Sequence, residues 1–424
     1  MPRIRGNRAR CPVFVFYLVH LLVLLLISSA EQLRSDLTAL DPRDPQYATI
    51  AVDRLLAVSR QAQASDLHLQ PAADALDVRW RVDGVLQPLA TLPAQISPNV
   101  VARLKVLANL LTYRTDVPQE GRIRADEGGM EVRVSTFPTL YGEKAVVRMF
   151  ADRGQYHTLD SLGLRPDITA ELRRLLAETS GAVLVTGPAG SGKTTTLYAC
   201  LRQIAAQSQA GRSLASLEDP IEVAVPGVAQ SQVSAAAGFD LAAGLRFLLR
   251  QDPEVIMVGE IRDRTTAETV FQASLTGHLV LSTFHAPSAA GAISRLSDMD
   301  IAPYLLRSGI LAIVSQRLVR RLCECSQPAD NADARLGLPV GSMRLPKGCT
   351  ACSGSGYRGR IVLAEMLTLQ HNALAGAVLA RDDLGRLEQL AIESGMTPLI
   401  RRACEAVEAG LTSPAEVRRV LGFA

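Results

Sequence analysis

The stretch GPAGSGKT, from Gly187 to Thr194, constrains the fold of this chain more than any other feature. It follows the apolar run AVLVT, which is typical of a buried strand, and it leads into TTTLYACLRQIAA, which is typical of a helix. In that context a glycine-rich loop surrounds phosphate oxygens with backbone N–H groups, and the helix N-terminus adds positive potential. We therefore predict a P-loop that binds a nucleoside triphosphate.

Each part of this loop has an expected role. The side chain of Lys193 should reach the β- and γ-phosphates, and the hydroxyl of Thr194 should bind magnesium. The expected cofactors are therefore a nucleoside triphosphate and Mg²⁺. The predicted nucleotide-binding residues are Gly187, Pro188, Ala189, Gly190, Ser191, Gly192, Lys193, Thr194 and Thr195.

The sequence around the P-loop predicts an α/β fold. From about Ile168 onward, helical segments alternate with short apolar runs, which are AVLVTG, SLASLE, VIMVGE and LVLSTF. Strands without polar alternation are buried on both faces, which is typical of a parallel sheet flanked by helices.

The preceding part of the chain has a mixed pattern. ATIAVDRLLAVSRQAQ and NVVARLKVLANLL show helical spacing, whereas ALDVRWRVDGVLQPL alternates and turns at Asp83-Gly84 like a hairpin. This predicts a smaller α+β domain before the ATPase core. The predicted division is 1–30 (basic and apolar segment), 31–152 (α+β domain), 153–167 (linker), 168–317 (ATPase core), 318–360 (tetracysteine element) and 361–424 (helical C-terminal region).

The first 30 residues differ from everything that follows. MPRIRGNRAR is basic, and the run from Val13 to Ile27 is apolar apart from His20. Such a start resembles a signal peptide, and its apolar run is short for a membrane span. Export would separate a P-loop from cytosolic ATP, which argues against a simple signal peptide. Three interpretations of this segment therefore stay open. They are a start codon assigned too far upstream, a membrane anchor that leaves the enzyme facing the cytoplasm, and a cleaved signal.

The cysteines and the net charge narrow the choice of partners. A net charge of +3 over 424 residues is too small to predict a nucleic-acid partner. Four of the seven cysteines, Cys323, Cys325, Cys349 and Cys352, crowd one short region, which favours a zinc site in a reducing compartment over a disulfide framework. The second pair has the spacing of a zinc knuckle, but the first is one residue tighter. Zinc binding and reduced, packed thiols both stay open.

Acidic residues end two of the predicted strands, and histidines flank a third. SLEDPIE contains Glu218, and VIMVGEIRD contains Glu260. Since ligand groups gather at the carboxyl ends of parallel strands, one carboxylate is expected to hold magnesium and the other to orient water. Acids that merely cap strand ends are the alternative. His278 and His285 flank LVLSTF, and spacing alone favours packed histidines with backbone hydrogen bonds over phosphate sensors.

Taken in this order, the motifs resemble those of the secretion ATPase superfamily. The resemblance is specifically to its type II secretion and type IV pilus assembly ATPases, the group that is like type II secretion system protein E. The resemblance runs from about Ile50 to the C-terminus. It implies a RecA-like P-loop domain with a parallel-rich sheet, a smaller α+β domain before it, a C-terminal cysteine element and a helical tail. The matching stretches are ASDLHLQP and VRWRVDGVL (second N-terminal domain), LEDPIE (aspartate box), LRFLLRQDPEVIMVGEIRD (Walker B region), TGHLVLSTFH (histidine box), CTACSGSGYRGR (zinc element) and LTSPAEVRRVLG (usual ending).

The resemblance also implies roles for individual residues. Glu218 would activate water, and Glu260 would bind magnesium together with Thr194. Lys193 and the two residues of the histidine box, His278 and His285, would also be catalytic. Arg122 in QEGR and Arg133 in VRVST would contact the phosphates from the N-terminal domain, a role that suits the fixed fork of arginine. The sequence departs from the family pattern in three places: at Glu120, where aspartate is usual, after His285, where Ala-Pro-Ser replaces Thr-Asn-Asp, and in the first cysteine pair.

The implied function is that of a homo-hexameric motor that hydrolyses ATP between its two domains. It would work in the cytoplasm, peripheral to the inner membrane, on an inner-membrane platform protein, and through it on the pilin-like subunits of a pseudopilus for type II secretion. A type IV pilus extension ATPase and a nucleotide-binding scaffold without turnover are the alternatives.

Overall fold

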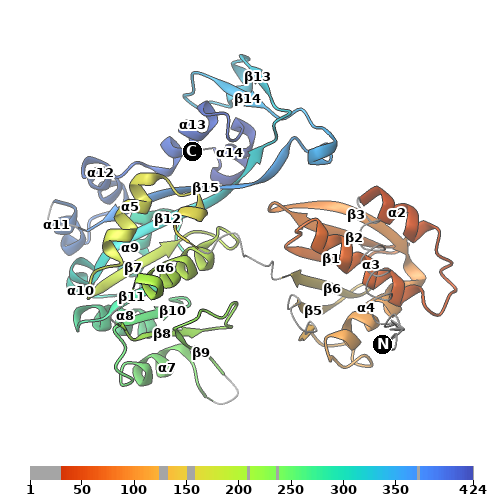
Figure 1. The fold of residues 1–424 in the computed structure, drawn as a ribbon, viewed down its shortest axis with the longest axis horizontal. Coiled ribbons are helices and arrows are strands. Elements are labelled where there is room, and N and C mark those ends of the chain that lie inside the picture. Colours follow the sequence, from red (N-terminus) through yellow and green to blue (C-terminus); the bar gives the residue numbers. More distant parts are fainter. Residues whose placement is uncertain are drawn as a thin grey trace, which may run out of the picture. The chain divides into compact units, whose positions relative to one another are not determined.

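The computed structural model describes residues 30–123, 132–149, 158–207, 211–234, 238–369 and 373–423. The chain divides into two compact units between Asp152 and Arg153 (Figure 1). The apolar run from Val13 to Ile27 lies outside the described residues. None of the helices in the described ranges combines the length and apolarity that a membrane crossing requires.

The N-terminal unit is built on an antiparallel six-stranded sheet with the order β3-β2-β1-β6-β5-β4. The predicted hairpin at Asp83-Gly84 is confirmed, and both residues have the positive φ that a tight hairpin turn requires. The elements are α2 (Ala30–Thr38), α3 (Tyr47–Gln61), β1 (Asp66–Pro71), β2 (Ala75–Val82), β3 (Val85–Pro93), α4 (Ser97–Leu107), β4 (Gln119–Ile123), β5 (Val132–Thr139) and β6 (Gly142–Met149).

Period-two alternation separates a buried face of this sheet from a polar face. On β2, Leu76 and Val78 are buried, whereas Arg79 between Val78 and Trp80 is exposed. The buried face packs with the apolar sides of α3 and α4 in one core, which includes Leu55 of α3. The polar face is therefore left to carry charged side chains.

The C-terminal unit contains a seven-stranded sheet with the order β15-β12-β7-β11-β10-β8-β9 (Figure 1). All neighbouring strands are parallel except β15, which runs antiparallel to β12. The strands are β7 (Gly181–Thr186), β8 (Leu214–Glu218), β9 (Ala229–Gln232), β10 (Val255–Val258), β11 (Leu279–Phe284), β12 (Ile310–Leu322) and β15 (Tyr357–Thr368).

Helices cover both faces of this sheet, as the unbroken apolar strands predict. Ala182 and Leu184 of β7 belong to one core, whereas Val183 and Val185 belong to another, so alternate side chains enter separate cores. The helices are α5 (Pro166–Leu175), α6 (Lys193–Gln207), α7 (Leu241–Leu248), α8 (Arg264–Leu275), α9 (Ala289–Asp298), α10 (Pro303–Gly309), α11 (Ala373–Ala380), α12 (Leu384–Glu393), α13 (Leu399–Glu408) and α14 (Pro414–Leu421).

Two strands cross boundaries that the sequence predicts. Strand β12 continues through the predicted boundary at 317/318, and β15 continues through the one at 360/361. The prediction that residues 361–424 are helical is wrong as far as Thr368, because β15 pairs with β12 along most of its length. A fourth core packs α13 and α14 against these strands, close to the small pair β13 (Gln327–Ala329) and β14 (Met343–Leu345).

Candidate active site

The P-loop joins the end of β7 to the start of α6. Gly187, Gly190 and Gly192 all have positive φ, and a Cβ on Gly187 would lie 2.5 Å from the carbonyl oxygen of Gln316. Only glycine fits such a position without strain. The loop therefore has the backbone curvature that a phosphate-binding cradle requires.

The side chain of Lys193 folds back onto this loop. Its Nζ donates to the carbonyl oxygens of Gly187 and Pro188, at 3.0 Å each. Burial lowers the pKa of Lys193, although Glu260 nearby opposes that shift. The ammonium group thus has backbone acceptors that phosphate oxygens can replace.

Gln316 is a P-loop contact that the sequence did not indicate. Its Nε2 donates to the carbonyl oxygen of Ser191 at 2.8 Å, and its Oε1 accepts from the hydroxyl of Thr196 at 3.1 Å. Gln316 is almost fully buried on β12, next to β7. The available signal was a glutamine shortly after the apolar start of this strand, because a buried amide requires partners.

Glu218 ends β8 and is buried, with only 3% of its surface exposed. Its Oε1 accepts from the hydroxyl of Ser216 at 2.6 Å and from Nε2 of Gln230 at 3.0 Å. Its Oε2 accepts from the hydroxyl of Tyr198. The carboxylate is therefore held by three side-chain donors rather than left in solvent at a strand end.

Glu260 follows β10 at the same edge of the sheet and faces the P-loop lysine. Its Oε1 lies 3.0 Å from Nε2 of His285, and its Oε2 accepts from Nε of Arg262 at 2.9 Å. The pKa of His285 is lowered by burial and by the positive charge of Lys193. Both glutamates and His285 thus lie where parallel α/β sheets bind ligands, beyond the carboxyl ends of the strands.

His278 lies at the other end of β11. Its Nδ1 is 3.0 Å from the carbonyl oxygen of Ala273, and its own carbonyl oxygen accepts from the N–H of Gly181, where β7 begins. The structure therefore does not bring His278 to the P-loop. Its hydrogen bond to Ala273 fits the interpretation as a packed histidine. Strand β11 separates His278 from His285.

Arg122 and Arg133 belong to the N-terminal unit, where they are direct cross-strand partners on β4 and β5. Arg148 is in turn the partner of Arg133 on β6. Nε of Arg133 donates to Oε1 of Glu120, the residue that replaces the aspartate usual in the family. A row of arginines on one face of this sheet is a suitable surface for an anion with several oxygens.

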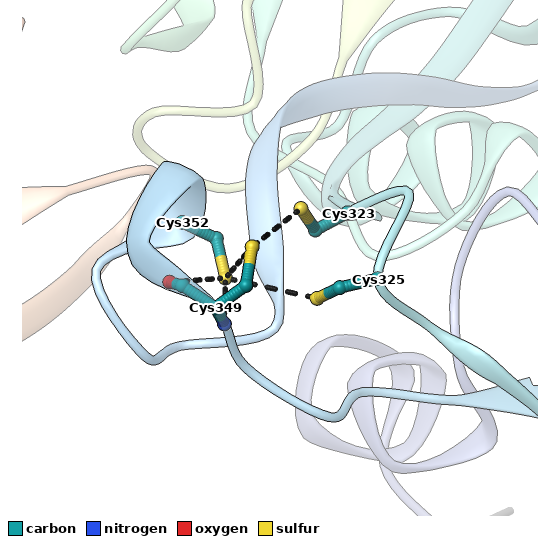
Figure 2. Close-up of side chains that lie close together, drawn as sticks. All are labelled: Cys323, Cys325, Cys349 and Cys352. Carbon is teal, nitrogen blue, oxygen red and sulfur yellow. Dashed lines mark hydrogen bonds between the residues drawn. The ribbon is translucent and has the colours of Figure 1, made fainter.

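The sulfur atoms of the four clustered cysteines face one another in one group (Figure 2). The Sγ–Sγ distances are 3.8 Å for Cys323–Cys349, 3.9 Å for Cys325–Cys352 and 3.7 Å for Cys349–Cys352. Four thiolates bound tetrahedrally at about 2.3 Å from zinc would lie about 3.8 Å apart, so the sulfur positions fit that ion.

Backbone donors support these thiols in an uneven way. Sγ of Cys352 accepts from the N–H groups of Cys349 and Gly356, at 3.1 and 3.2 Å. Burial opposes the shift, but these donors lower the pKa of Cys352. For Cys325, burial raises the pKa and the backbone of Gly348 counters it. Cys325 of the tight first pair thus receives backbone support from the opposite loop.

Comparison with known proteins identifies the family. Residues 43–419 match the profile of the family described as Type II/IV secretion system protein. Type II secretion system protein E of Klebsiella pneumoniae is 41% identical over 402 residues, which are 93% of this chain and 80% of that protein. Type IV pilus assembly ATPase PilB of Thermus thermophilus is 38% identical over 365 residues, which are 84% of this chain and 41% of that protein.

Solved structures share the fold. The Legionella pneumophila ATPase DotB has a TM-score of 0.62 at 20% identity and covers 87% of this chain and 95% of its own. The pilus retraction motor PilT has a TM-score of 0.58 at 23% identity and covers 86% of this chain and 95% of its own. The resemblance predicted from the motifs is confirmed: the chain belongs to the Type II/IV secretion system protein family, with secretion and pilus assembly ATPases among its relatives.

Proposed function

We propose that this chain is a magnesium-dependent ATPase that powers the assembly of a pilin-like filament in a type II secretion system. One observation carries the proposal: the P-loop, Glu218, Glu260 and His285 gather at the carboxyl edge of one parallel sheet. The 41% identity to a type II secretion system protein E over nearly the whole chain favours this process.

The chemistry requires positioning and charge stabilisation more than covalent catalysis. The P-loop N–H groups and Lys193 hold the phosphates, after Lys193 exchanges its backbone acceptors for phosphate oxygens. Glu218 orients a water and takes its proton as the water attacks the γ-phosphorus, and the bond from that phosphorus to the oxygen of ADP breaks.

Oxygen donors at the P-loop fit magnesium. The hydroxyl of Thr194 and the carboxylate of Glu260 would hold the ion, and both are the hard oxygen ligands that it prefers. When bound, the ion neutralises charge on the β- and γ-phosphates. The contact of His285 with Glu260 supports a role for that histidine in sensing the γ-phosphate through this carboxylate.

We also propose that arginines of the N-terminal unit act on the nucleotide. Arg122 and Arg133 would contact phosphate oxygens in a homo-hexamer, so that hydrolysis changes the relation between the units and produces motion. Their cross-strand pairing supports this role, because it directs two positive groups to one face.

Zinc would hold the four cysteines at the ends of β12 and β15. The sulfur distances and the paired arrangement support a closed structural site rather than a catalytic one (Figure 2). No open position is needed, since all four donors come from cysteine.

The motor would work at the cytoplasmic side of the inner membrane, where ATP is available, on a platform protein that adds pilin-like subunits. A type IV pilus extension ATPase is the second candidate, favoured by the 38% identity to a pilus assembly ATPase. A scaffold without turnover is disfavoured, because Lys193, Glu218 and Glu260 are all present at the P-loop edge.

Phosphate release from ATP by the purified full-length protein, with and without Mg²⁺, tests this proposal. We expect Mg²⁺-dependent turnover in the fraction that light scattering identifies as a hexamer. A folded hexamer that binds ATP without turnover would support the scaffold instead. In the host, deletion should abolish release of extracellular proteins and leave surface pili intact, whereas the converse would identify a pilus motor.

A further inference from the structure

The hydroxyl of Tyr198 joins the P-loop helix to the carboxylate that we propose activates water. Tyr198 is buried on α6 and donates to Oε2 of Glu218. The same hydroxyl oxygen accepts from the N–H groups of Glu222 and Val223, at 3.1 and 3.4 Å. One phenol therefore contacts both the carboxylate and the loop that follows it.

The position of Tyr198 on α6 links it to the phosphate cradle. Thr194 and Tyr198 are four residues apart in one helix, so their side chains lie on the same face, about 6 Å apart along the axis. Thr194 is the proposed magnesium ligand at the start of that helix. The first turn of α6 thus sets the spacing between the metal-binding hydroxyl and Glu218.

Tyr198 can act only as a donor toward Glu218. Burial raises the pKa of Tyr198, and the carboxylate raises it further, so the phenol stays protonated. The other two donors, Ser216 and Gln230, both contact Oε1. Among the described contacts, Tyr198 is the side chain that fixes Oε2, which leaves the carboxylate with one defined orientation.

We propose that Tyr198 is a positioning residue that holds Glu218 in register with the P-loop, an inference that rests on the proposed role of Glu218 in hydrolysis. A purely structural role would be to fill the core beneath the P-loop with an aromatic ring. The two roles separate because phenylalanine keeps the ring and loses only the hydroxyl.

Tyr198→Phe in the full-length protein tests this. We expect kcat to fall by about 10- to 100-fold, the usual cost of loosening a group that orients a reacting one. The KM for ATP and the affinity for a fluorescent ATP analogue should change less than about twofold, because the phosphate cradle is untouched. Tyr304→Phe removes the same hydroxyl from an exposed position on α10 and should keep the wild-type kcat.

A double-mutant cycle with Glu218→Gln shows where Tyr198 acts. Single-turnover hydrolysis of labelled ATP gives the rates of the slow variants. If Tyr198 works through Glu218, adding Tyr198→Phe to Glu218→Gln should cost no further rate. An equal loss in both backgrounds, or wild-type kcat in the single variant, would overturn the inference.

Two outcomes distinguish this inference from the proposed function. Full hydrolysis by Glu218→Gln would remove Glu218 from the chemistry, and the role of Tyr198 would fail with it, whereas the proposed ATPase activity would stand. An inactive Glu218→Gln beside a fully active Tyr198→Phe would remove only the role of Tyr198. If Tyr198→Phe does not fold, the same cycle with Ser216→Ala, which deletes the hydroxyl 2.6 Å from Oε1, decides whether donors to this carboxylate set the rate.

Discussion

Arg122 and Arg133 lie directly opposite each other on adjacent antiparallel strands of the N-terminal unit. Like charges in that position repel, and such pairs destabilise a sheet. Glu120 pairs with Arg133 and relieves part of the repulsion. Such a like-charged pair lowers the free energy of unfolding. Its presence therefore fits a functional requirement for two positive groups on one face of the sheet.

Replacing Arg122 with glutamine should therefore separate activity from stability. We expect kcat to fall by about 100-fold, since a transition-state donor is lost. The melting temperature should change little, because relief of the repulsion offsets the loss of the other contacts of Arg122. Calorimetry and phosphate release measure the two effects, and Arg79→Gln, at an exposed position of β2, is the matched control. A large loss of stability with unchanged kcat would identify Arg122 as structural.

Lys193→Ala should abolish turnover and leave the fold intact. The lysine makes two bonds to its own loop, and both carbonyl acceptors can turn to water when it is removed. We expect hydrolysis to fall by at least about 100-fold. Circular dichroism checks the fold, and normal turnover in a folded variant would contradict the P-loop assignment.

Glu218→Gln and Glu260→Gln should fail in different ways. The Glu218 variant should bind ATP normally, keep the Mg²⁺ dependence of the wild type and lose most of its kcat. The Glu260 variant should need a higher Mg²⁺ concentration for half-maximal activity, because a charged ligand is gone. Titration of Mg²⁺ at saturating ATP distinguishes them, and the opposite pattern would show that the two roles are exchanged.

Glu416 should dominate the stability of the C-terminal helices. It is fully buried on α14, where Arg320 and Arg419 donate to it at distances from 2.6 to 2.9 Å. Glu416→Gln leaves the half-buried Arg320 and the exposed Arg419 without their counter-charge, which should cost about 1–3 kcal/mol. Urea unfolding measures the loss, and Glu393→Gln on α12 is an exposed control.

The same carboxylate predicts a pH dependence. Burial would raise the pKa of Glu416, but hydrogen bonds from Arg419 and Arg320 lower it below the ordinary value of 4.5. A folded-state pKa below the unfolded one contributes stability that is present above pH 4.5 and is lost as the pH falls through the folded value. The glutamine variant should lack this component, so the two unfolding curves should converge in acid.

When the protein is isolated under reducing conditions, its cysteine cluster should contain one zinc ion per chain. Cys352→Ser should lose the metal and loosen the ends of β12 and β15, because three remaining thiolates hold zinc less well. Elemental analysis and limited proteolysis measure these effects. Cys404→Ala, on α13 and outside the cluster, should keep its zinc. A wild-type protein that contains no zinc would leave the thiols as a reduced, packed group.

The elements that the sequence predicts well are those with a strong local pattern. The P-loop, the buried strand β7 and the hairpin at Asp83-Gly84 each depend on residues that are neighbours in the chain. His278 and His285 show the limit of this reasoning. They share one motif, yet the six residues of β11 lie between them and place them beyond opposite ends of that strand, about 23 Å apart.

Contacts between distant segments could not be predicted in the same way. Gln316 meets the P-loop only because β12 pairs with β7, and 125 residues separate Gln316 from Ser191. In the sequence, Tyr198 cannot be told apart from the other apolar positions of an amphipathic helix. Its contact with Glu218 depends on how β8 packs beside that helix. Boundaries at 318 and 361 failed for the same reason, since antiparallel pairing of β15 with β12 leaves no local signal.

Strand β12 runs without a break from Ile310 to Leu322, one residue before Cys323. Its first half pairs with β7, the strand that leads into the P-loop, and it pairs with β15 from Ala312 to Leu322. Near its end, the N–H of Arg320 donates to Glu416 of α14. The cysteine element is therefore not a module attached by a linker. Opening the cysteine element requires disruption of the β12–β15 hydrogen bonds, which continue into the seven-stranded sheet. The cysteine element and this sheet should therefore exchange their amide hydrogens as one cooperative unit.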